Sequence, residues 1–440
     1  MNTPVVSAPT DEAASTRYRY IVVFVLAFAY MLNYLDRQIL SVLAEPVKQD
    51  LGLSDTQLGM LTGLMFALFY TVFGIPIGAL ADRWNRVRII AISCGIWSVF
   101  TALSGLATNF VTLALARIGV GVGEAGCSPP SYSIISDYFP PERRGGALAL
   151  YVLGVPAGSL IGTMAAGWIA VEYGWRSAFI LVGLLGVLFA PIIVWAVREP
   201  VRGRYDNPEK GGAQDTGQKA GFFEAFLFFW KSPTLVLNAI AAGATSFVSY
   251  GLMNWAPAFL IRVRGMELSE IALYYSVALT GALVLGAWLG SVISDRFGAK
   301  NPIWYSLLPG AGLLVSTPFI FGFTSVAAWP VAMAFLIVPL VLKSVYLVPA
   351  LALLQNRSPA RYRATASAVM LFLLNLIGLG CGPLFVGMMS DYLEPRYGVM
   401  ALGYSLNWLA PFMVLAFLLQ CATALSMVRD RRRNANAGHA

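Results

Sequence analysis

The stretch Gly78-Ala-Leu-Ala-Asp82-Arg83-Trp-Asn-Arg86 follows one long apolar run, and Gly290-Ser-Val-Ile-Ser-Asp295-Arg296-Phe-Gly298 follows another. Their aspartates are 213 residues apart, close to half of the 440-residue chain. Each stretch leads from an apolar run into a short basic loop. A motif repeated at half the chain length predicts two similar halves, each crossing a membrane the same number of times.

Composition supports a membrane protein. Hydrophobic residues make up 58% of the chain and charged residues 12%, against roughly 45–50% and 25% in soluble domains. Since about 20 apolar residues cross a bilayer as a helix, we expect an all-α, multi-pass protein. Its expected spans lie at about 20–41, 56–80, 88–107, 110–135, 146–170, 176–197, 233–260, 270–293, 303–323, 328–354, 364–389 and 403–427.

The basic residues orient these spans. An even number of spans places both termini on one side. If that side is the cytoplasm, 22 of the 30 basic residues lie in cytoplasmic segments, five in outer segments and three within spans. Cytoplasmic loops carry such an excess of Lys and Arg, so we expect both termini in the cytoplasm, with the protein in the plasma or inner membrane. The net charge of +8 then reflects topology and indicates no nucleic-acid partner.

The polar segments suggest the domain boundaries. We expect a cytoplasmic tail at 1–19, a six-helix bundle at 20–198, a cytoplasmic linker at 199–231, a second bundle at 232–428 and a tail at 429–440. No signal peptide is expected, because the segment before Arg17 is polar. The Phe-rich end of the linker, from Gly221 to Trp230, either lies along the membrane surface or simply leads into span seven.

Metal and cofactor chemistry has little support. His439, the single histidine, is in the C-terminal tail. The cysteines all lie inside apolar runs and are expected to be small core residues. They are Cys94, Cys127, Cys381 and Cys421. We therefore expect no metal site and no cofactor.

Two ionisable residues, Arg117 and Glu124, interrupt the otherwise nearly uncharged run from Phe110 to Ile135. Seven residues are two helical turns, so both lie on one face, roughly 10 Å apart. Ionisable groups at membrane depth usually face a bundle interior or a water-filled path. Asp36 reaches a similar depth in span one and can pair with Arg117, while Arg37 either satisfies Asp36 or snorkels outward.

These groups have two interpretations. Burial disfavours the charged form of Glu124 and a neighbouring arginine favours it, so a conformational change can switch its protonation. The alternative is a static ion pair that locks span four to its neighbours. Gly119 and Gly123, beside Glu124, are expected to allow close helix packing.

Several motifs resemble a known family. The Gly-x-x-x-Asp-Arg-x-x-Arg loop at 78–86, which the Asp295-Arg296 loop of the second half repeats in part, resembles the best-known motif of the major facilitator superfamily. Within that superfamily, the N-terminal half resembles the Spinster family. The matching pieces are Asn33-Tyr34-Leu35-Asp36-Arg37, Arg117-Ile-Gly-Val-Gly121-Val-Gly123-Glu124-Ala125 and Val155-Pro156-Ala-Gly158-Ser159. The resemblance, over residues 20–428, implies twelve transmembrane helices in two pseudo-symmetric six-helix bundles. It also implies that Asp36, Arg117 and Glu124 form one proton-coupling triad.

The loop motifs are candidates for a gate. Asp82 could pair with a basic residue beside span eleven, such as Arg361 or Arg363, and so close the cytoplasmic side in one state. The expected gating set is Asp82, Arg83, Arg86, Arg143, Arg144, Asp295 and Arg296. Alternatively, the basic members of this set only mark topology.

Polar residues at mid-membrane depth in the C-terminal half predict a binding site. Lys343 and Tyr346 are three residues apart and share a helix face. Lys343 is the candidate for an anionic headgroup, unless it snorkels or bonds helix carbonyls. The full expected set is Lys343, Tyr346, Asn375, Thr245, Tyr250 and Asn254.

Together, these features predict a monomeric, proton-driven secondary transporter that works by alternating access among membrane lipids. The resemblance implies an amphipathic, lipid-like substrate of lysophospholipid or sphingolipid type. The alternative is proton-driven export of drugs or other hydrophobic molecules, which the Gly378-Leu-Gly-Cys-Gly382-Pro383 element favours. We expect no enzyme, because no nucleophile, metal or cofactor constellation is evident. The phosphate-binding loop of an ATP-driven pump is also missing from the sequence.

Overall fold

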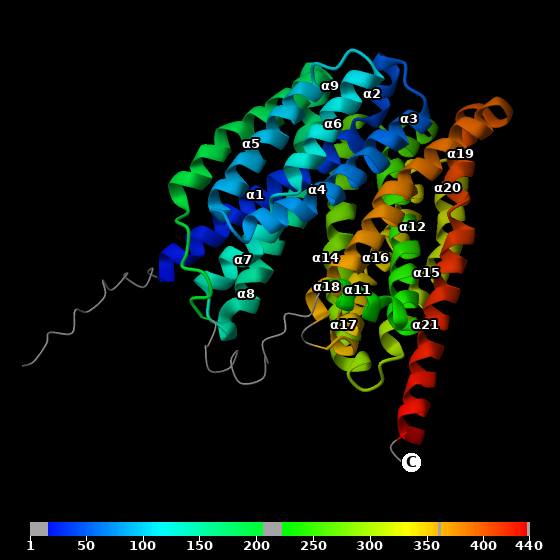
Figure 1. Cartoon of the computed structure of the whole chain (residues 1–440). Coiled ribbons are helices and arrows are strands. Elements are labelled where there is room, and N and C mark those ends of the chain that lie inside the picture. The colour runs from blue at the N-terminus through cyan, green and yellow to red at the C-terminus, as the bar shows by residue number, and fades with distance from the viewer. Residues whose placement is uncertain (1–15, 206–221, 360–361, 438–440) are drawn as a thin grey trace, which may run out of the picture.

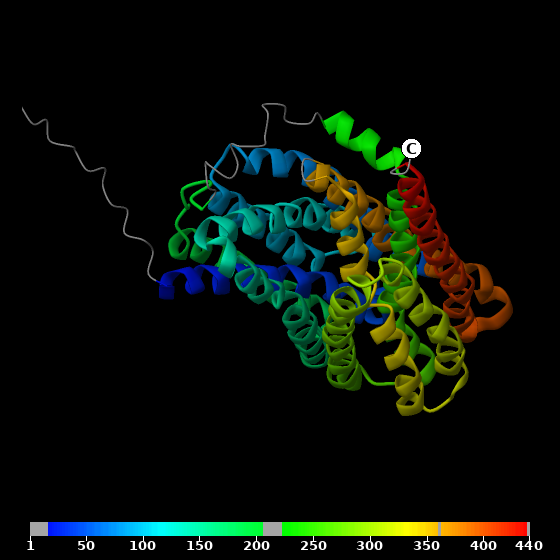
Figure 2. The ribbon, with the colours of Figure 1, turned by 90° about the horizontal axis from the view of Figure 1, so that it is seen from below.

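The computed structural model describes residues 16–205, 222–359 and 362–437, and the regular structure in these residues is helical. Two lobes lie side by side, one from each half of the chain (Figures 1 and 2). The first lobe contains α1 (Thr16–Val42), α2 (Ala44–Leu51), α3 (Asp55–Gly59), η1 (Met60–Leu64), α4 (Met65–Ala81), α5 (Arg86–Ser104), α6 (Phe110–Glu124), α7 (Ser128–Tyr138), α8 (Pro141–Val152) and α9 (Gly154–Ala196).

The second lobe repeats this order after the linker. It contains α11 (Phe222–Lys231), α12 (Pro233–Arg264), α13 (Leu268–Glu270), η2 (Ile271–Tyr275), α14 (Ser276–Val292), η3 (Ile293–Gly298), α15 (Trp304–Ser325), α16 (Trp329–Leu342), α17 (Leu347–Arg357), α18 (Arg363–Leu373), η5 (Leu374–Gly380), α19 (Cys381–Tyr397), η6 (Gly398–Met400), α20 (Ala401–Asn407) and α21 (Ala410–Ala437). Linker residues 206–221 lie outside the described residues.

These helices account for twelve membrane crossings. Within the described residues, ten helical stretches are long and apolar enough to cross a membrane. Two of them, 141–196 and 365–430, have 56 and 66 residues, or about 84 and 99 Å at 1.5 Å per residue, against about 30 Å of hydrocarbon. Gly174 (φ +80°) and Gly398 (φ +54°) break these two stretches. Each therefore crosses twice, and the predicted fold of two six-helix bundles is confirmed.

The two halves share local geometry as well as helix order. Gly52 ends α2 and Gly265 ends α12, both left-handed with φ near +65°, and they are 213 residues apart. Each is followed by a short α-helix, a π-helical turn and a long helix, namely α3, η1 and α4 in the first half and α13, η2 and α14 in the second. In the second loop motif, one extra residue separates Gly290 from Asp295, and that segment is the π-helix η3.

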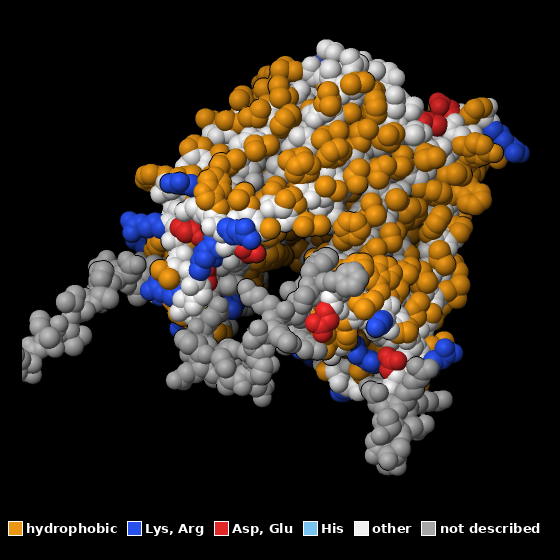
Figure 3. All heavy atoms as spheres, viewed as in Figure 1, with side chains coloured by type: hydrophobic (Ala, Val, Ile, Leu, Met, Phe, Trp, Pro, Cys, Tyr) orange, Lys and Arg blue, Asp and Glu red, His pale blue; other side chains and the backbone are white. Residues whose placement is uncertain are grey.

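We call the membrane side that holds both chain ends the terminal side, and the other the opposite side (Figure 1). The lobes meet toward the opposite side, where α3 and η1 pack on α19 and α1 packs on α12. On the terminal side, a hollow separates them, and hydrophobic side chains cover the middle of the visible face (Figure 3).

Glycines allow the closest approach between the halves. A Cβ on Gly59 would stand 2.6 Å from the Pro383 carbonyl oxygen, and one on Gly63 would stand 2.8 Å from that of Gly380. Because both neighbours are backbone atoms, a side chain at either position would push α3 and η1 away from α19 and η5. The Gly-Pro element of span eleven therefore lies at the interface between the halves.

The Phe-rich end of the linker forms a separate helix, α11, which precedes the N-cap of α12 at Ser232. Phe229 is buried against the second lobe, whereas Leu227 and Trp230 are exposed. This amphipathic arrangement is compatible with the membrane-surface position predicted from the sequence, which stays a prediction.

Candidate functional site

The middle of α1 places two charged residues in the first lobe. Asp36 is 1% exposed and accepts hydrogen bonds from Thr101 of α5 and from Arg117 of α6, the latter at 3.3 Å. Arg117 is 2% exposed. The pairing of Asp36 with Arg117 that the sequence predicted is therefore present. A charge this deeply buried is tolerated only with such a partner.

Arg37 has a different partner from the one expected. Its Nε atom donates to Glu124 Oε2 at 2.6 Å, so it neither satisfies Asp36 nor snorkels outward, and that prediction was wrong. Consecutive residues on a helix point about 100° apart, which directs Asp36 and Arg37 to two different charges on α6. The Asp-Arg sequence on α1 was the signal for two parallel ion pairs.

Glu124 lies where span four is interrupted. The helix α6 ends at Glu124, residues 125–127 form turns, and α7 continues the span. Gly123 lets this segment approach α5, since a Cβ there would stand 2.6 Å from the Trp97 backbone nitrogen. Interrupted helices near the middle of the membrane commonly form the binding sites of transporters.

Aromatic rings pack against the arginines of both ion pairs. The Arg37 guanidinium lies 4.7 Å from the ring centre of Tyr70 and 5.0 Å from that of Phe66, and Arg117 lies 5.6 Å from the same Phe66 ring. Arg37 is 20% exposed at its side chain, whereas Glu124 is fully buried. Arg37 therefore connects the buried carboxylate to the exterior.

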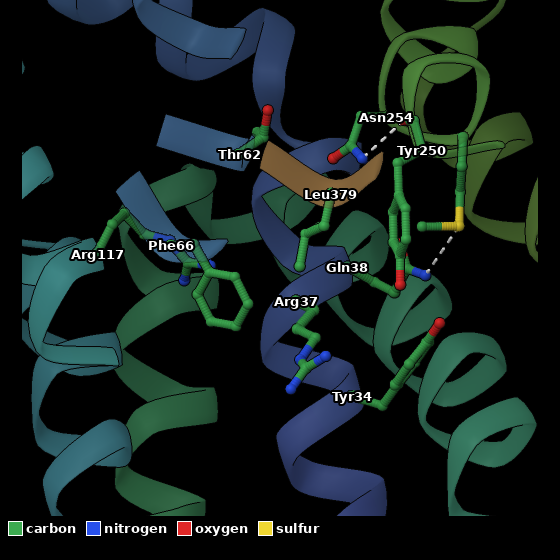
Figure 4. A pocket seen from close by; sticks show the side chains of 10 residues that line it. Tyr34, Arg37, Gln38, Thr62, Phe66, Arg117, Tyr250, Asn254 and Leu379 are labelled. Carbon is green, nitrogen blue, oxygen red and sulfur yellow. Dashed lines mark hydrogen bonds between the residues drawn. The ribbon is translucent and has the colours of Figure 1, made fainter. Parts of the chain in front are cut away.

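A pocket between the lobes contains Arg37 (Figure 4). Residues of both halves line it, with aromatic, amide and guanidinium groups facing one another. They are Tyr34, Arg37, Gln38, Thr62, Phe66, Arg117, Tyr250, Met253, Asn254 and Leu379. The arrangement offers positive charge, hydrogen-bonding groups and apolar surface to one ligand.

The pseudo-symmetry of the fold extends into this site. Arg37 and Tyr250 are 213 residues apart and both line the pocket, and Ser41 donates to Asn254, also 213 residues away. The position equivalent to Asp36 is Ser249, which accepts a hydrogen bond from Lys343 Nζ at 3.1 Å.

Lys343 occupies a matching interruption. Turns at 343–346 separate α16 from α17 in span ten. Like the Arg117–Asp36 contact, the Lys343–Ser249 contact joins a basic residue of an interrupted span to the first span of the same half, but with a hydroxyl in place of the carboxylate. Among these equivalent positions, the carboxylates belong to the first half.

The structure divides the predicted binding residues. Tyr250 and Asn254 line the pocket, whereas the other four do not belong to its lining. Lys343 is 1% exposed beside Ser249, and Thr245 is buried and donates to the Ala241 carbonyl. Tyr346 is 8% exposed within the core of the second lobe, and Asn375 is half-buried in η5.

The predicted gating residues lie on the terminal side. Asp82, Arg83, Arg143, Asp295 and Arg296 are exposed, and Arg144 donates to the Ser136 carbonyl. Arg361 lies outside the described residues. Arg363 donates to the Ser358 carbonyl within its own half. In this conformation the structure does not bring Asp82 to a basic residue of the second half within the described contacts.

Arg86 plays a different part. It is 1% exposed and forms ion pairs with Asp137 and Glu199. Its Nη1 atom lies 2.5 Å from Asp137 Oδ2, and its Nε atom lies 2.6 Å from Glu199 Oε1. Glu199 also accepts from the Val87 backbone. Arg86 thereby ties the loop after span two to the ends of spans four and six, all in the first lobe.

A polar cluster that the sequence did not reveal joins the lobes on the opposite side. We call it the opposite-side latch. Arg262 of α12 contacts both oxygens of Asp55 at 2.7 and 2.9 Å and Glu45 at 2.9 Å. Asp391 accepts from the Asp55 and Thr56 backbone at the start of α3. The latch consists of Glu45, Lys48, Asp55, Arg262, Ser390 and Asp391.

Comparison with known proteins places this arrangement in a family. The family model of the major facilitator superfamily matches residues 26–383. The chain belongs to the major facilitator superfamily. It is similar to an MFS-type efflux pump of Mycolicibacterium smegmatis, with 34% identity over 94% of this chain and 95% of the relative. It is also similar to human protein spinster homolog 1, with 29% identity over 94% and 82% of the two chains.

A solved structure of this superfamily is similar along almost the whole chain. It is a bacterial homologue of the human lysosomal transporter Spinster in an inward-facing, unoccupied conformation. The TM-score is 0.87, with 32% identity, covering 94% of this chain and 99% of that one. The resemblance to the Spinster family seen in the motifs is thereby confirmed, and the chain is a multi-pass membrane transporter.

Proposed function

We propose that the chain is a proton-coupled secondary transporter of an amphipathic, lipid-like solute. The observation that supports this most strongly is the Arg37–Glu124 pair. Glu124 is a fully buried carboxylate, and its partner Arg37 lines the pocket between the lobes. One arginine therefore contacts both a group that can carry a proton and the space that can hold a substrate.

This sharing supplies a physical basis for coupling. An anionic group that enters the pocket attracts the Arg37 guanidinium and weakens its bond to Glu124. A buried carboxylate that loses its counter-charge is more easily protonated. Substrate binding and the charge state of Glu124 are thus linked through one side chain, and by reciprocity protonation of Glu124 frees Arg37 for the substrate. Asp36 and Arg117 hold the adjacent pair and position α1 against α6.

The lipid-like substrate is inferred from the pocket lining. A guanidinium suits an anionic headgroup, while Phe66, Leu379 and Met253 provide apolar surface. The motifs that resemble the Spinster family imply such a substrate. Arg37 is better placed than Lys343 to meet the headgroup, because Lys343 is buried beside Ser249.

A second candidate is export of hydrophobic organic molecules. The similarity to an MFS-type efflux pump favours it. The apolar part of the pocket lining, at Phe66, Met253 and Leu379, would serve either substrate class. The two differ in their need for an anionic group on the substrate.

The alternating-access step follows from the contacts between the lobes. The lobes are joined by the opposite-side latch and separated toward the terminal side. With the terminal side in the cytoplasm, as the basic residues predict, this conformation is inward-facing. Rocking about the central contacts would open the latch and bring the loops with Asp82 and Asp295 toward the other half.

Transport in liposomes tests the proposal. Glu124→Gln preserves the size of the side chain but removes its titration, so it should abolish transport of a labelled lysophospholipid driven by a pH gradient. Glu172→Gln, the same change at an exposed position, is the matched control and should transport normally. A Glu124→Gln protein that keeps the wild-type dependence on the gradient would refute coupling through Glu124. A lipid that no variant moves, with a cationic drug moved by the wild type, would favour the efflux function.

A further inference from the structure

Several buried polar atoms near Glu124 lack a hydrogen-bond partner. They include Oε1 of Glu124, both amide atoms of Asn33 and the hydroxyl of Tyr151. All three residues are at most 1% exposed. Buried polar groups are normally satisfied, by protein atoms or by ordered water, so a set of unpaired ones needs an explanation.

The unpaired groups follow one face of α1. Tyr30, Asn33 and Arg37 are spaced three and four residues apart, so they lie above one another on the helix. Arg37 bonds Glu124 at 2.6 Å, and Tyr30 stacks on Tyr151 with ring centres 4.7 Å apart. Asn33 therefore stands between the Arg37–Glu124 pair and the Tyr30–Tyr151 stack, on the terminal side of the pair.

Residues at the junction of α6 with α7 add polar groups beside those of α1. The Cys127 thiol interacts electrostatically with Glu124 and lies near the Tyr151 hydroxyl. Ser128 and Ser131 also approach that hydroxyl, although it forms no hydrogen bond of standard geometry. Polar groups thus extend from Glu124 to Tyr151 along both α1 and the junction of α6 with α7.

The line reaches the surface at Tyr132. This residue of α7 packs edge-on against Tyr151, with ring centres 5.3 Å apart, and is 40% exposed. It also interacts with Tyr70, whose ring covers Arg37. The exposed end of the line therefore lies near the space between the lobes, on the terminal side.

We infer that Asn33, Tyr151 and Tyr132 form the path by which protons pass between Glu124 and the terminal side. Water held by the unpaired amide and hydroxyl groups would connect them, because a polar, buried space with several free partners is where proteins hold ordered water. The path is separate from the substrate pocket, whose lining does not include these three residues. This inference rests on the proposed proton coupling through Glu124.

The charged and titratable neighbours of Glu124 come from several elements. On α1 they are Asp36 and Arg37, and on α6 Arg117. The others are Cys127 and the groups that act through Cys127 or Arg37, which are Cys94 of α5, Tyr30 of α1, Tyr70 of α4 and Tyr250 of α12. The arginines and Asp36 set the charge of Glu124. Asn33 and Tyr151 add no charge, so they would affect only the access of protons to Glu124.

Two substitutions separate a path from a structural role. Asn33→Leu replaces an unpaired amide with an apolar group of similar size, which for folding alone should be neutral or stabilising. Tyr151→Phe keeps the stacked ring and removes the hydroxyl. Ser306→Ala removes another buried, unpaired hydroxyl, in the second lobe, and is the matched control.

The measurement is time-resolved infrared spectroscopy of the purified protein after a pH jump, with the Glu124 carboxyl band identified by its absence in Glu124→Gln. We expect Asn33→Leu and Tyr151→Phe to slow the band change by about tenfold or more, as loss of a proton-transfer group does, with unchanged thermal stability. Ser306→Ala should match the wild type.

Wild-type rates in both path variants would overturn the inference while leaving coupling through Glu124 intact. A wild-type band that never responds to pH would overturn the proposed coupling and the path together.

Discussion

Arg262 of the second half holds both carboxylate oxygens of Asp55 of the first half, at 2.7 and 2.9 Å, on the side of the membrane away from the chain ends. Asp55 is 2% exposed and also accepts from Lys48 and Ser390. The Asp55 carboxylate is thus bonded by one neighbouring helix of its own lobe, α2, and by two helices of the other lobe, α12 and α19. The conformation described here depends on this pair, because opening the opposite side requires separating it.

Removing Asp55 should shift the protein toward an opposite-side-open conformation. Breaking a buried ion pair by deleting one partner costs roughly 3–5 kcal/mol, and conformational states commonly differ by only a few kcal/mol. We therefore expect Asp55→Asn to lengthen the distance between spin labels at Thr108 and Ser269, two exposed sites on that side. Pulsed electron spin resonance in a cysteine-free background measures it.

Asp50→Asn is the control for this experiment. Asp50 bonds Arg176 on the same side of the membrane, but within one lobe and at an exposed position. Its loss should leave the label distance unchanged. If Asp55→Asn also left the distance distribution unchanged, the latch would not determine the conformation.

Arg86 should matter for stability more than for gating. Arg86→Ala would leave Asp137 and Glu199 without their counter-charge, which costs roughly 3–5 kcal/mol for a buried pair. We expect a clear fall in the melting temperature of the protein in detergent. Tryptophan fluorescence during heating measures this temperature. Arg88→Ala, an exposed site two residues away, should change it little. Equal melting temperatures for the two variants would contradict the stabilising role.

The fold was predictable because its signals are local. Apolar runs, the repeated aspartate loop and the glycines each predict structure from a few neighbouring residues, and the excess of basic loops orients the whole. The Asp36–Arg117 pair was predictable from depth alone, since two antiparallel spans bring residues of equal depth to the same level.

The contacts that the sequence did not reveal are long-range. Asp55 and Arg262 are 207 residues apart, and nothing near either residue indicates the other. Arg37 was assigned to its sequence neighbour, although the 100° step between helix residues directs it to Glu124. Lys343 was expected in the binding site because a mid-membrane lysine is unusual, but its burial beside Ser249 depends on how α16 packs against α12.

The Asp50–Arg176 pair predicts a pH dependence. Hydrogen bonds from Arg176 and then Trp175 lower the pKa of the Asp50 carboxyl below its ordinary value. A group with a lowered pKa in the folded state adds stability above its unfolded pKa of about 3.9, and this is lost as the pH falls through the folded value. The small difference in melting temperature between wild type and Asp50→Asn should therefore be present at pH 7 and vanish in strong acid. A difference that persisted there would contradict the assignment.

Arg37 and Lys343 give opposite expectations for substrate recognition. Arg37 lines the pocket and is partly exposed, whereas Lys343 is buried and bonded to Ser249. Arg37→Gln should weaken binding of an anionic lysophospholipid by about tenfold or more, since hydrogen bonds to charged groups contribute roughly 1.5–3 kcal/mol, and should affect a neutral monoacylglycerol much less. Lys343→Gln, the matched change in the other half, should weaken the binding of both lipids to a similar, smaller extent. Thermal-shift titration of each purified variant with both lipids measures this, because a ligand stabilises the folded protein in proportion to its occupancy. A selective loss of the anionic lipid in Lys343→Gln, with none in Arg37→Gln, would instead assign the headgroup to Lys343, as the sequence first predicted. Equal losses for both lipids in Arg37→Gln would show that Arg37 supports the pocket without reading the charge of its ligand.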